Sequence, residues 1–158
     1  MKTTQLRKST LVACIIFLFS SMIITAQKQE WVFNYKIANT AEELSKIMDN
    51  PEANIVRSVA DFKQYVQSNP KLRKVFAKKG LLKAVASTMK FNKRGLKTFS
   101  YKSLKEVYPD RIKDILSEIT PGFGFGSETL GVDYDGYACV AKGTCETEYN
   151  SICIGDNC

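Results

Sequence analysis

The segment YACVAKGTCETEYNSICIGDNC, residues 137–158, holds four of the five cysteines of this 158-residue chain. Those four, Cys139, Cys145, Cys153 and Cys158, are spaced C-x5-C-x7-C-x4-C. An even number of cysteines crowded into so short a segment is typical of a small disulfide module in an oxidising compartment. The segment has few large aliphatic residues, so cross-links would supply the stability that burial cannot, about 2–4 kcal/mol per bridge. Four cysteines allow three pairings, and the spacing does not choose among them.

A zinc site made of the same four cysteines is the alternative. Zinc ligands usually come in close pairs, roughly two to four residues apart. The gaps here are five, seven and four residues, with no CxxC pair, and the chain has no histidine. We therefore expect two disulfides and no bound metal.

Residues 1–26 have the pattern of a secretion signal. The basic residues Lys2, Arg7 and Lys8 precede an apolar run of 16 residues, 11–26, that ends in small residues. This run is shorter than the roughly 20 residues that a membrane span needs. We expect cleavage near Ala26 and a secreted or periplasmic mature protein.

The run Leu11-Val12-Ala13-Cys14 resembles the lipobox of bacterial lipoproteins, which would make Cys14 a lipid-attachment site. A lipobox normally closes an apolar stretch, whereas most of the apolar residues here follow Cys14. The favoured interpretation is that Cys14 is a small apolar residue inside the signal. Its removal leaves an even number of cysteines, which agrees with disulfide pairing.

Charge divides the mature chain into two unlike segments. Residues 27–120 carry 19 Lys/Arg against 10 Asp/Glu, whereas residues 121–158 carry one lysine against six acids. The sign changes beside Pro121-Gly122, a turn signal that favours a boundary there. We predict a signal over 1–26, a basic helical domain or pro-segment over 27–120, and a Gly-rich joint with a cysteine-rich module over 121–158.

Most of the basic segment is predicted to be helical. The alternating stretch WVFNYKI, residues 31–37, predicts a short strand. Capping residues, prolines and apolar periodicity then predict a series of helices. One of them ends at Gly80, and the next extends from Leu81 to Lys90 before a turn at 92–95. The predicted starts or caps are Thr40, Ser58, Asn69, Leu81, Ser100 and Pro109.

The predicted fold class is therefore mainly α. It is a small helical bundle with a short N-terminal strand, followed by a Gly-rich joint and a small disulfide-bonded C-terminal module. Four glycines in residues 121–131 predict a flexible or turn-rich joint, with Phe123 and Phe125 resting on the helices. Asp135-Gly136 predicts the turn of a β-hairpin in the tail.

Residues 62–105 form a tract of 44 residues with 13 Lys/Arg and no acid. Basic residues set among apolar ones at helical spacing suit an anionic cell surface or membrane. The alternative is that they solvate the outer face of ordinary core helices. The signal disfavours intracellular nucleic acid as a partner, and no RNP motif or zinc finger occurs. The candidates for contact with an anionic surface are Lys71, Arg73, Lys74, Lys78, Lys79, Lys83, Lys93 and Arg94.

The sequence predicts no enzyme activity and no cofactor. Without histidine, Ser-His and Cys-His nucleophiles and histidine-ligated catalytic metals are absent. The acidic residues are scattered outside any recognisable motif, and a thiol–disulfide enzyme would need a CxxC pair.

Two functions remain. The first is a secreted, bacteriocin- or toxin-like precursor whose disulfide-bonded C-terminal peptide acts at anionic cell surfaces, with a target-cell receptor as a further candidate partner. Its layout resembles that of exported antibacterial peptides. The alternative is an unprocessed secreted or periplasmic, non-catalytic binding protein with a disulfide-clasped tail. A tail packed on the helices would favour the binding protein, and a free tail would favour the precursor. The sequence leaves the oligomeric state open.

Overall fold

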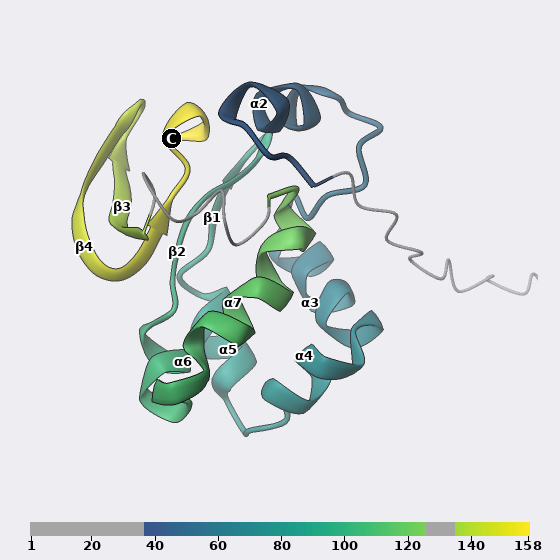
Figure 1. Ribbon diagram of the computed structural model, residues 1–158, viewed down its shortest axis with the longest axis vertical. Helices are drawn as coiled ribbons and strands as arrows, with labels where there is room; N and C mark the ends of the chain where they lie inside the picture. Colours follow the sequence, from purple (N-terminus) through teal and green to yellow (C-terminus); the bar gives the residue numbers. More distant parts are fainter. Residues whose placement is uncertain (1–36, 126–134) are drawn as a thin grey trace, which may run out of the picture. The chain divides into compact units, whose positions relative to one another are not determined.

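The computed structural model describes residues 37–125 and 135–158 (Figure 1). The chain divides into two units, residues 1–30 and residues 31–158, and every described residue belongs to the second. The signal predicted over 1–26 lies outside the described residues. So does the strand predicted over 31–37, except for its last residue.

A run of helices leads into a four-stranded antiparallel sheet whose strand order is β1-β2-β4-β3. In this order β4 lies between β2 and β3, although β4 is the last strand in sequence. The elements in chain order are α2 (Ala41–Asp49), α3 (Val59–Ser68), α4 (Pro70–Val75), α5 (Leu81–Ala86), β1 (Lys90–Asn92), β2 (Gly95–Ser100), α6 (Lys102–Val107), η1 (Pro109–Arg111), α7 (Ile112–Ile119), η2 (Thr120–Phe123), β3 (Asp135–Ala141), β4 (Thr144–Cys153) and η3 (Gly155–Asn157).

The predicted fold class is wrong, because residues 90–153 contain a sheet that joins the basic segment to the tail. The helix expected to reach Lys90 ends at Ala86, and the turn expected at 92–95 joins β1 to β2. The side-chain oxygen of Asn92 accepts hydrogen bonds from the backbone N–H groups of residues 94 and 95 at 2.8 and 3.2 Å. Gly95 has φ +144°, a conformation that disfavours other residues. The turn therefore reverses the chain into a hairpin.

The helix starts predicted from capping residues are confirmed at three places. The side-chain oxygens of Thr40, Ser58 and Asn69 accept hydrogen bonds from backbone N–H groups two or three residues on, at 2.9–3.2 Å. These bonds satisfy N–H groups that a helix leaves without partners in its first turn. The helix that begins after Asn69 ends at Val75, earlier than the predicted end at Gly80.

Phe123 lies at the centre of the core. Its ring centroid is 6.0 Å from that of Phe62 on α3, 6.1 Å from that of Phe99 on β2, 6.1 Å from that of Phe125 and 6.4 Å from that of Phe91 on β1. These rings come from a helix, the β1–β2 hairpin and the segment after α7. Residues 120–123 form the 3-10 turn η2, and Phe123 packs on helix α3, so this half of the segment agrees with the predicted turn-rich joint whose phenylalanines rest on the helices.

Gly122 permits this segment to pack closely. A Cβ atom at Gly122 would lie 2.7 Å from the ring of Tyr65, so a larger residue would displace the ring. The carbonyl of Gly122 accepts a hydrogen bond of 2.7 Å from the N–H of Val56. Gly122 therefore lies in a turn, as its sequence predicted, and it also permits a close backbone contact.

The tail hairpin differs from its prediction. Asp135 and Gly136 lie inside β3, and the turn between β3 and β4 is formed by Lys142 and Gly143. Gly143 has φ +73°, which suits a tight turn. β4 pairs with β3 along one edge and, at residues 151–153, with β2 along the other.

Arg57 connects α2 to the β1–β2 turn. Its guanidinium donates hydrogen bonds to the carbonyls of Met48 at 3.2 Å, Asn50 at 2.7 Å, and Arg94. Burial lowers the pKa of Arg57, and the nearby carboxylate of Asp61 opposes that change. A cation that binds the last carbonyls of a helix also interacts favourably with its dipole.

Candidate functional site

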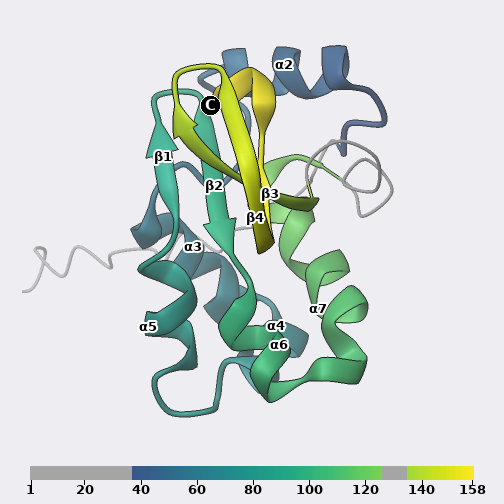
Figure 2. The ribbon, with the colours of Figure 1, turned by 90° about the vertical axis from the view of Figure 1, so that its left-hand side faces the viewer.

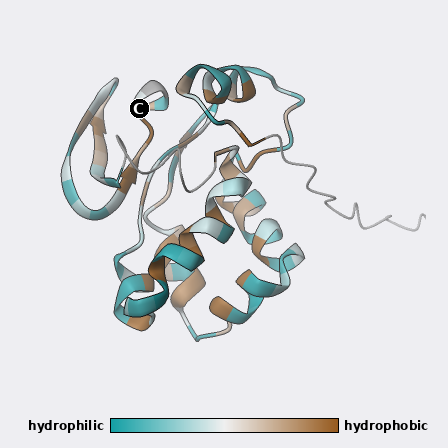
Figure 3. Ribbon diagram, viewed as in Figure 1, coloured by the Kyte–Doolittle hydropathy of each residue, from teal (hydrophilic) through white to brown (hydrophobic). Residues whose placement is uncertain are grey.

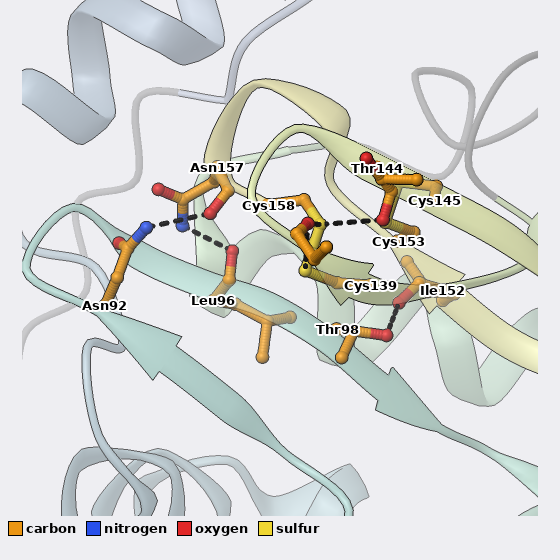
Figure 4. Close-up of a disulfide and its surroundings, with 11 residues drawn as sticks. Asn92, Leu96, Thr98, Cys139, Thr144, Cys145, Ile152, Cys153, Asn157 and Cys158 are labelled. Atoms are coloured by element: carbon orange, nitrogen blue, oxygen red, sulfur yellow. Dashed lines mark hydrogen bonds between the residues drawn. A yellow bond between two sulfur atoms is a disulfide. The ribbon is translucent and has the colours of Figure 1, made fainter.

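Two disulfides cross-link the tail, which confirms the prediction from the four cysteines. One joins Cys139 to Cys158 with a Cα–Cα distance of 5.5 Å, and the other joins Cys145 to Cys153 with a Cα–Cα distance of 6.1 Å. Of the three pairings that the sequence allowed, the structure has the nested one. The inner bridge links the two ends of β4, and the outer bridge links β3 to the chain end (Figure 4).

The sulfur atoms form a buried cluster. Cys139, Cys153 and Cys158 are 3%, 0% and 7% exposed, whereas Cys145 is partly exposed. The Sγ atoms of the three buried cysteines lie within 4.8 Å of one another. Zinc would need these sulfurs as thiolates. Because each sulfur is bonded to another, the cluster offers no thiolate ligand unless its bridges are reduced.

The chain end after β4 is attached to β1 and β2 by hydrogen bonds (Figure 4). The Asn157 side-chain amide donates to the carbonyl of Leu96 at 2.6 Å, and the Asn92 amide donates to the carbonyl of Asn157 at 2.8 Å. The N–H of Ile154 donates to the carbonyl of Lys97 at 2.9 Å. Nothing local in residues 154–157 indicates these distant partners.

The junction between β2 and α6 also contacts the tail. The Tyr101 hydroxyl donates a hydrogen bond of 2.6 Å to Oδ1 of Asp135, and the Tyr101 N–H donates one of 2.8 Å to the carbonyl of Asn150. Burial, followed by the hydrogen bond and the charge of Asp135, raises the pKa of Tyr101 above its ordinary value. The sequence predicted neither contact.

This shift predicts a loss of stability at alkaline pH. Because folding raises the pKa of Tyr101, its stabilising contribution is complete below the unfolded-state pKa of about 10 and is lost as the pH rises above that value. We expect the melting temperature to fall more steeply with pH between about 9 and 11 in the wild-type protein than in Tyr101→Phe. Tyr149, which is 83% exposed, supplies the control: Tyr149→Phe should keep the wild-type slope. Equal slopes in all three proteins would contradict the prediction.

Six of the predicted anion-binding residues lie close together along the chain, on α4, on α5 and in the turn between them. All six are exposed, and we call them the α4–α5 basic surface: Lys71, Arg73, Lys74, Lys78, Lys79 and Lys83. Most of the large apolar residues of these helices face inward, with Leu72 and Val85 both 0% exposed. The ribbon accordingly alternates between hydrophobic and hydrophilic colours along these helices (Figure 3).

The other two predicted residues lie elsewhere. Lys93 and Arg94 are in the β1–β2 turn, at the end of the sheet next to α2 and away from α5 (Figure 2). Arg94 binds Asp49 through Nε and Oδ1 at 2.6 Å and also donates to the hydroxyl of Ser45 at 2.7 Å. The acid-free tract therefore supplies one basic surface and, separately, a structural ion pair to α2.

A surface hollow of about 490 Å³ borders the α4–α5 basic surface. Lys71 lines it and forms a 2.5 Å ion pair with Glu118, and Arg111 lies 5.8 Å from the ring centroid of Tyr108. Asp114 adds a further acid to the lining. Because both signs of charge occur in it, the hollow does not by itself select a ligand.

None of the helices within residues 37–125 and 135–158 combines the length and the apolar character that crossing a bilayer requires. No family model matches the chain, and no curated protein or solved structure matches it. The fold and the site together define a cysteine-rich α+β domain whose tail is cross-linked by two disulfides.

Proposed function

We propose that this chain is an exported, non-catalytic binding protein in which the cysteine-rich tail is a permanent part of the fold. The observation that carries the proposal is the position of β4 between β2 and β3. Ile152 on β4 and Ile154 just after it are 0% and 1% exposed and belong to the main core. Burying one such side chain contributes about 1.5–3 kcal/mol, so removing the tail would expose the core of the remaining domain.

Export is supported by two independent features. Residues 1–26 have the pattern of a secretion signal, and two disulfides form and persist in oxidising compartments. The absence of histidine from the chain supports a non-catalytic role, because it removes the commonest general base and nucleophile partner.

The proposal is tested by the intact mass of the exported product, measured before and after reduction. We expect one polypeptide that begins near Gln27 and ends at Cys158, and that gains four hydrogen atoms when its two bridges are reduced. A separate fragment that begins near residue 121 would contradict the proposal.

The second candidate is the precursor of a bacteriocin- or toxin-like peptide, favoured by the charge reversal at residue 121. Release of its peptide would require cleavage of the chain and also separation of β4 from β2, to which it is paired at three positions. The same mass measurement distinguishes the two functions, because only the precursor yields a free cysteine-rich peptide.

The α4–α5 basic surface is the part of the proposed binding protein that suits an anionic partner. Its large apolar neighbours Leu72, Val75, Phe76, Leu81 and Val85 are buried and Leu82 is partly buried, so we propose binding that depends mainly on charge. Salt screens exposed charges over about 8 Å at physiological ionic strength. We therefore propose a salt-sensitive interaction with an anionic cell surface.

Neutralising three lysines of this surface is expected to weaken binding to vesicles that contain anionic lipid. For Lys78→Gln/Lys79→Gln/Lys83→Gln we expect about a tenfold loss at low salt, since each lysine near such a surface contributes at most about 1 kcal/mol and screening reduces this. Vesicle co-sedimentation at low and high salt measures it, with neutral vesicles as the reference.

The matched control is Lys46→Gln/Lys93→Gln/Lys142→Gln. It removes the same charge from three exposed lysines on α2, in the β1–β2 turn and in the β3–β4 turn, none of them on the α4–α5 basic surface. We expect it to bind nearly as well as the wild type. Equal loss in both variants, or none in either, would contradict a role for this surface.

A further inference from the structure

We propose that the four tail cysteines form a thiol-exchange site with two alternative disulfide pairings. A small external thiolate enters at Cys145 and converts the pairs Cys139–Cys158 and Cys145–Cys153 into the pairs Cys139–Cys145 and Cys153–Cys158. The proposal concerns the reactivity of the bridges and does not depend on the binding function.

Exposure determines the point of entry. A thiolate must reach a disulfide sulfur to attack it. Cys145 is partly exposed, whereas Cys153 is 0% exposed and both partners of the outer bridge are at least 93% buried. The external thiolate therefore attacks Sγ of Cys145, and Cys153 leaves as a thiolate.

Proximity determines the second step. The Cys153 thiolate is released within 4.8 Å of the sulfurs of both Cys139 and Cys158. Attack on Cys158 forms the Cys153–Cys158 bond and breaks the outer bridge, so Cys139 leaves as a thiolate. This transfer requires only local movement of sulfurs that already lie in the same cluster.

Strand register determines the third step. Cys139 on β3 and Cys145 on β4 are directly paired across the two strands. Residues opposite each other in an antiparallel pair have Cα atoms about 4.5–5.5 Å apart, within the range that a disulfide spans. The Cys139 thiolate therefore attacks Sγ of Cys145, forms the Cys139–Cys145 bond and expels the external thiolate.

The three exchanges balance without an oxidant or a reductant. Each step breaks one S–S bond and forms one, the negative charge moves from sulfur to sulfur, and the external thiolate is regenerated. The product keeps β3 and β4 cross-linked but no longer ties β3 to the chain end. Exchange would therefore move the cross-link of the chain end from β3 to the end of β4 without opening the hairpin.

The first experiment uses two matched variants. Cys145→Ser leaves one free thiol at Cys153, inside the sulfur cluster, and Cys153→Ser leaves one at Cys145, which is outside the 4.8 Å group. Each protein is alkylated after equilibration near pH 8, and its disulfides are mapped. In Cys145→Ser we expect the label to shift from Cys153 to Cys139. In Cys153→Ser we expect it to shift from Cys145 to Cys158, because Cys145 is paired with Cys139 across the two strands and its thiolate can displace Cys158 from the outer bridge.

Label confined to Cys153 in Cys145→Ser would overturn the proposal. The second experiment treats the wild-type protein with substoichiometric β-mercaptoethanol and then quenches it with acid, so it does not depend on the folding of a variant. We expect peptides linked through Cys139–Cys145 and Cys153–Cys158 to appear with no net gain of thiols. Recovery of only the original pairs and their reduced forms would also overturn it.

Discussion

Replacing Phe123 with alanine lowers the free energy of unfolding by about 4 kcal/mol, which is the middle of the range for a fully buried phenylalanine. Phe123 is 1% exposed, and its ring contacts four other aromatic rings. Those rings come from α3, β1, β2 and the segment that follows η2. Their separate attachments prevent them from collapsing into the space left by the ring, so the cavity cost is added to the lost burial.

Denaturant unfolding followed by circular dichroism measures this loss. Tyr149→Ala is the control, because its side chain is 83% exposed and its truncation should change the free energy of unfolding by less than about 0.5 kcal/mol. A loss below about 1 kcal/mol for Phe123→Ala, well outside the range for a core phenylalanine, would contradict the central place given to this ring.

Removing the outer bridge with Cys139→Ala/Cys158→Ala is expected to cost about 3 kcal/mol. A disulfide restricts the unfolded chain, and the restriction grows with the length of the loop that it closes. The outer bridge spans 19 residues and the inner bridge spans 8. The matched variant Cys145→Ala/Cys153→Ala should therefore cost less, by about 0.8 kcal/mol on the same scale.

Both double variants are compared with the wild type by denaturant unfolding under non-reducing conditions. The order of the two losses is the decisive result, since it follows from loop length alone. A larger loss for the inner bridge, or no loss for the outer one, would contradict this account of how the tail is stabilised.

Local chemistry in the sequence predicted the local structure well. Thr40, Ser58 and Asn69 were identified as caps because a side-chain oxygen at a helix start has its partners two or three residues away. The disulfides were predicted from an even number of crowded cysteines, although their pairing was not, because pairing depends on how β3, β4 and the chain end come together.

The sheet could not be predicted in the same way, because its partners are distant in sequence. Thr98 pairs with Cys153, and Phe99 pairs with Ile152. Strand β2 also lacks the alternation that indicates a half-buried strand, since Leu96, Thr98 and Phe99 are all buried. Strand β1 begins at Lys90, where the predicted helix ended, and ends at Asn92, where the predicted turn began. The local signals favoured helices, so the predicted fold class was mainly α. The long-range pairing of the strands shows that this prediction is wrong.

The positions of the candidate binding residues in the fold could not be predicted from the sequence either. The run of cations from residue 71 to residue 83 was interpreted as one surface with Lys93 and Arg94, because all belong to one acid-free tract. The chain reverses at the β1–β2 turn, and this places Arg94 against Asp49. Whether a basic residue is available to a partner depends on contacts that a charge pattern does not contain.

Amide hydrogen exchange tests most directly whether the tail belongs to the same cooperative unit as the helices. The N–H groups of Tyr101 and Ile154 bind carbonyls across the boundary between the basic segment and the tail, and those of Phe62 and Phe76 bind within the helical part. We predict that all four exchange with the free energy of global unfolding. Fast exchange at Tyr101 and Ile154 while Phe62 and Phe76 stay protected would contradict the account, because it would show that the tail detaches from an intact helical domain.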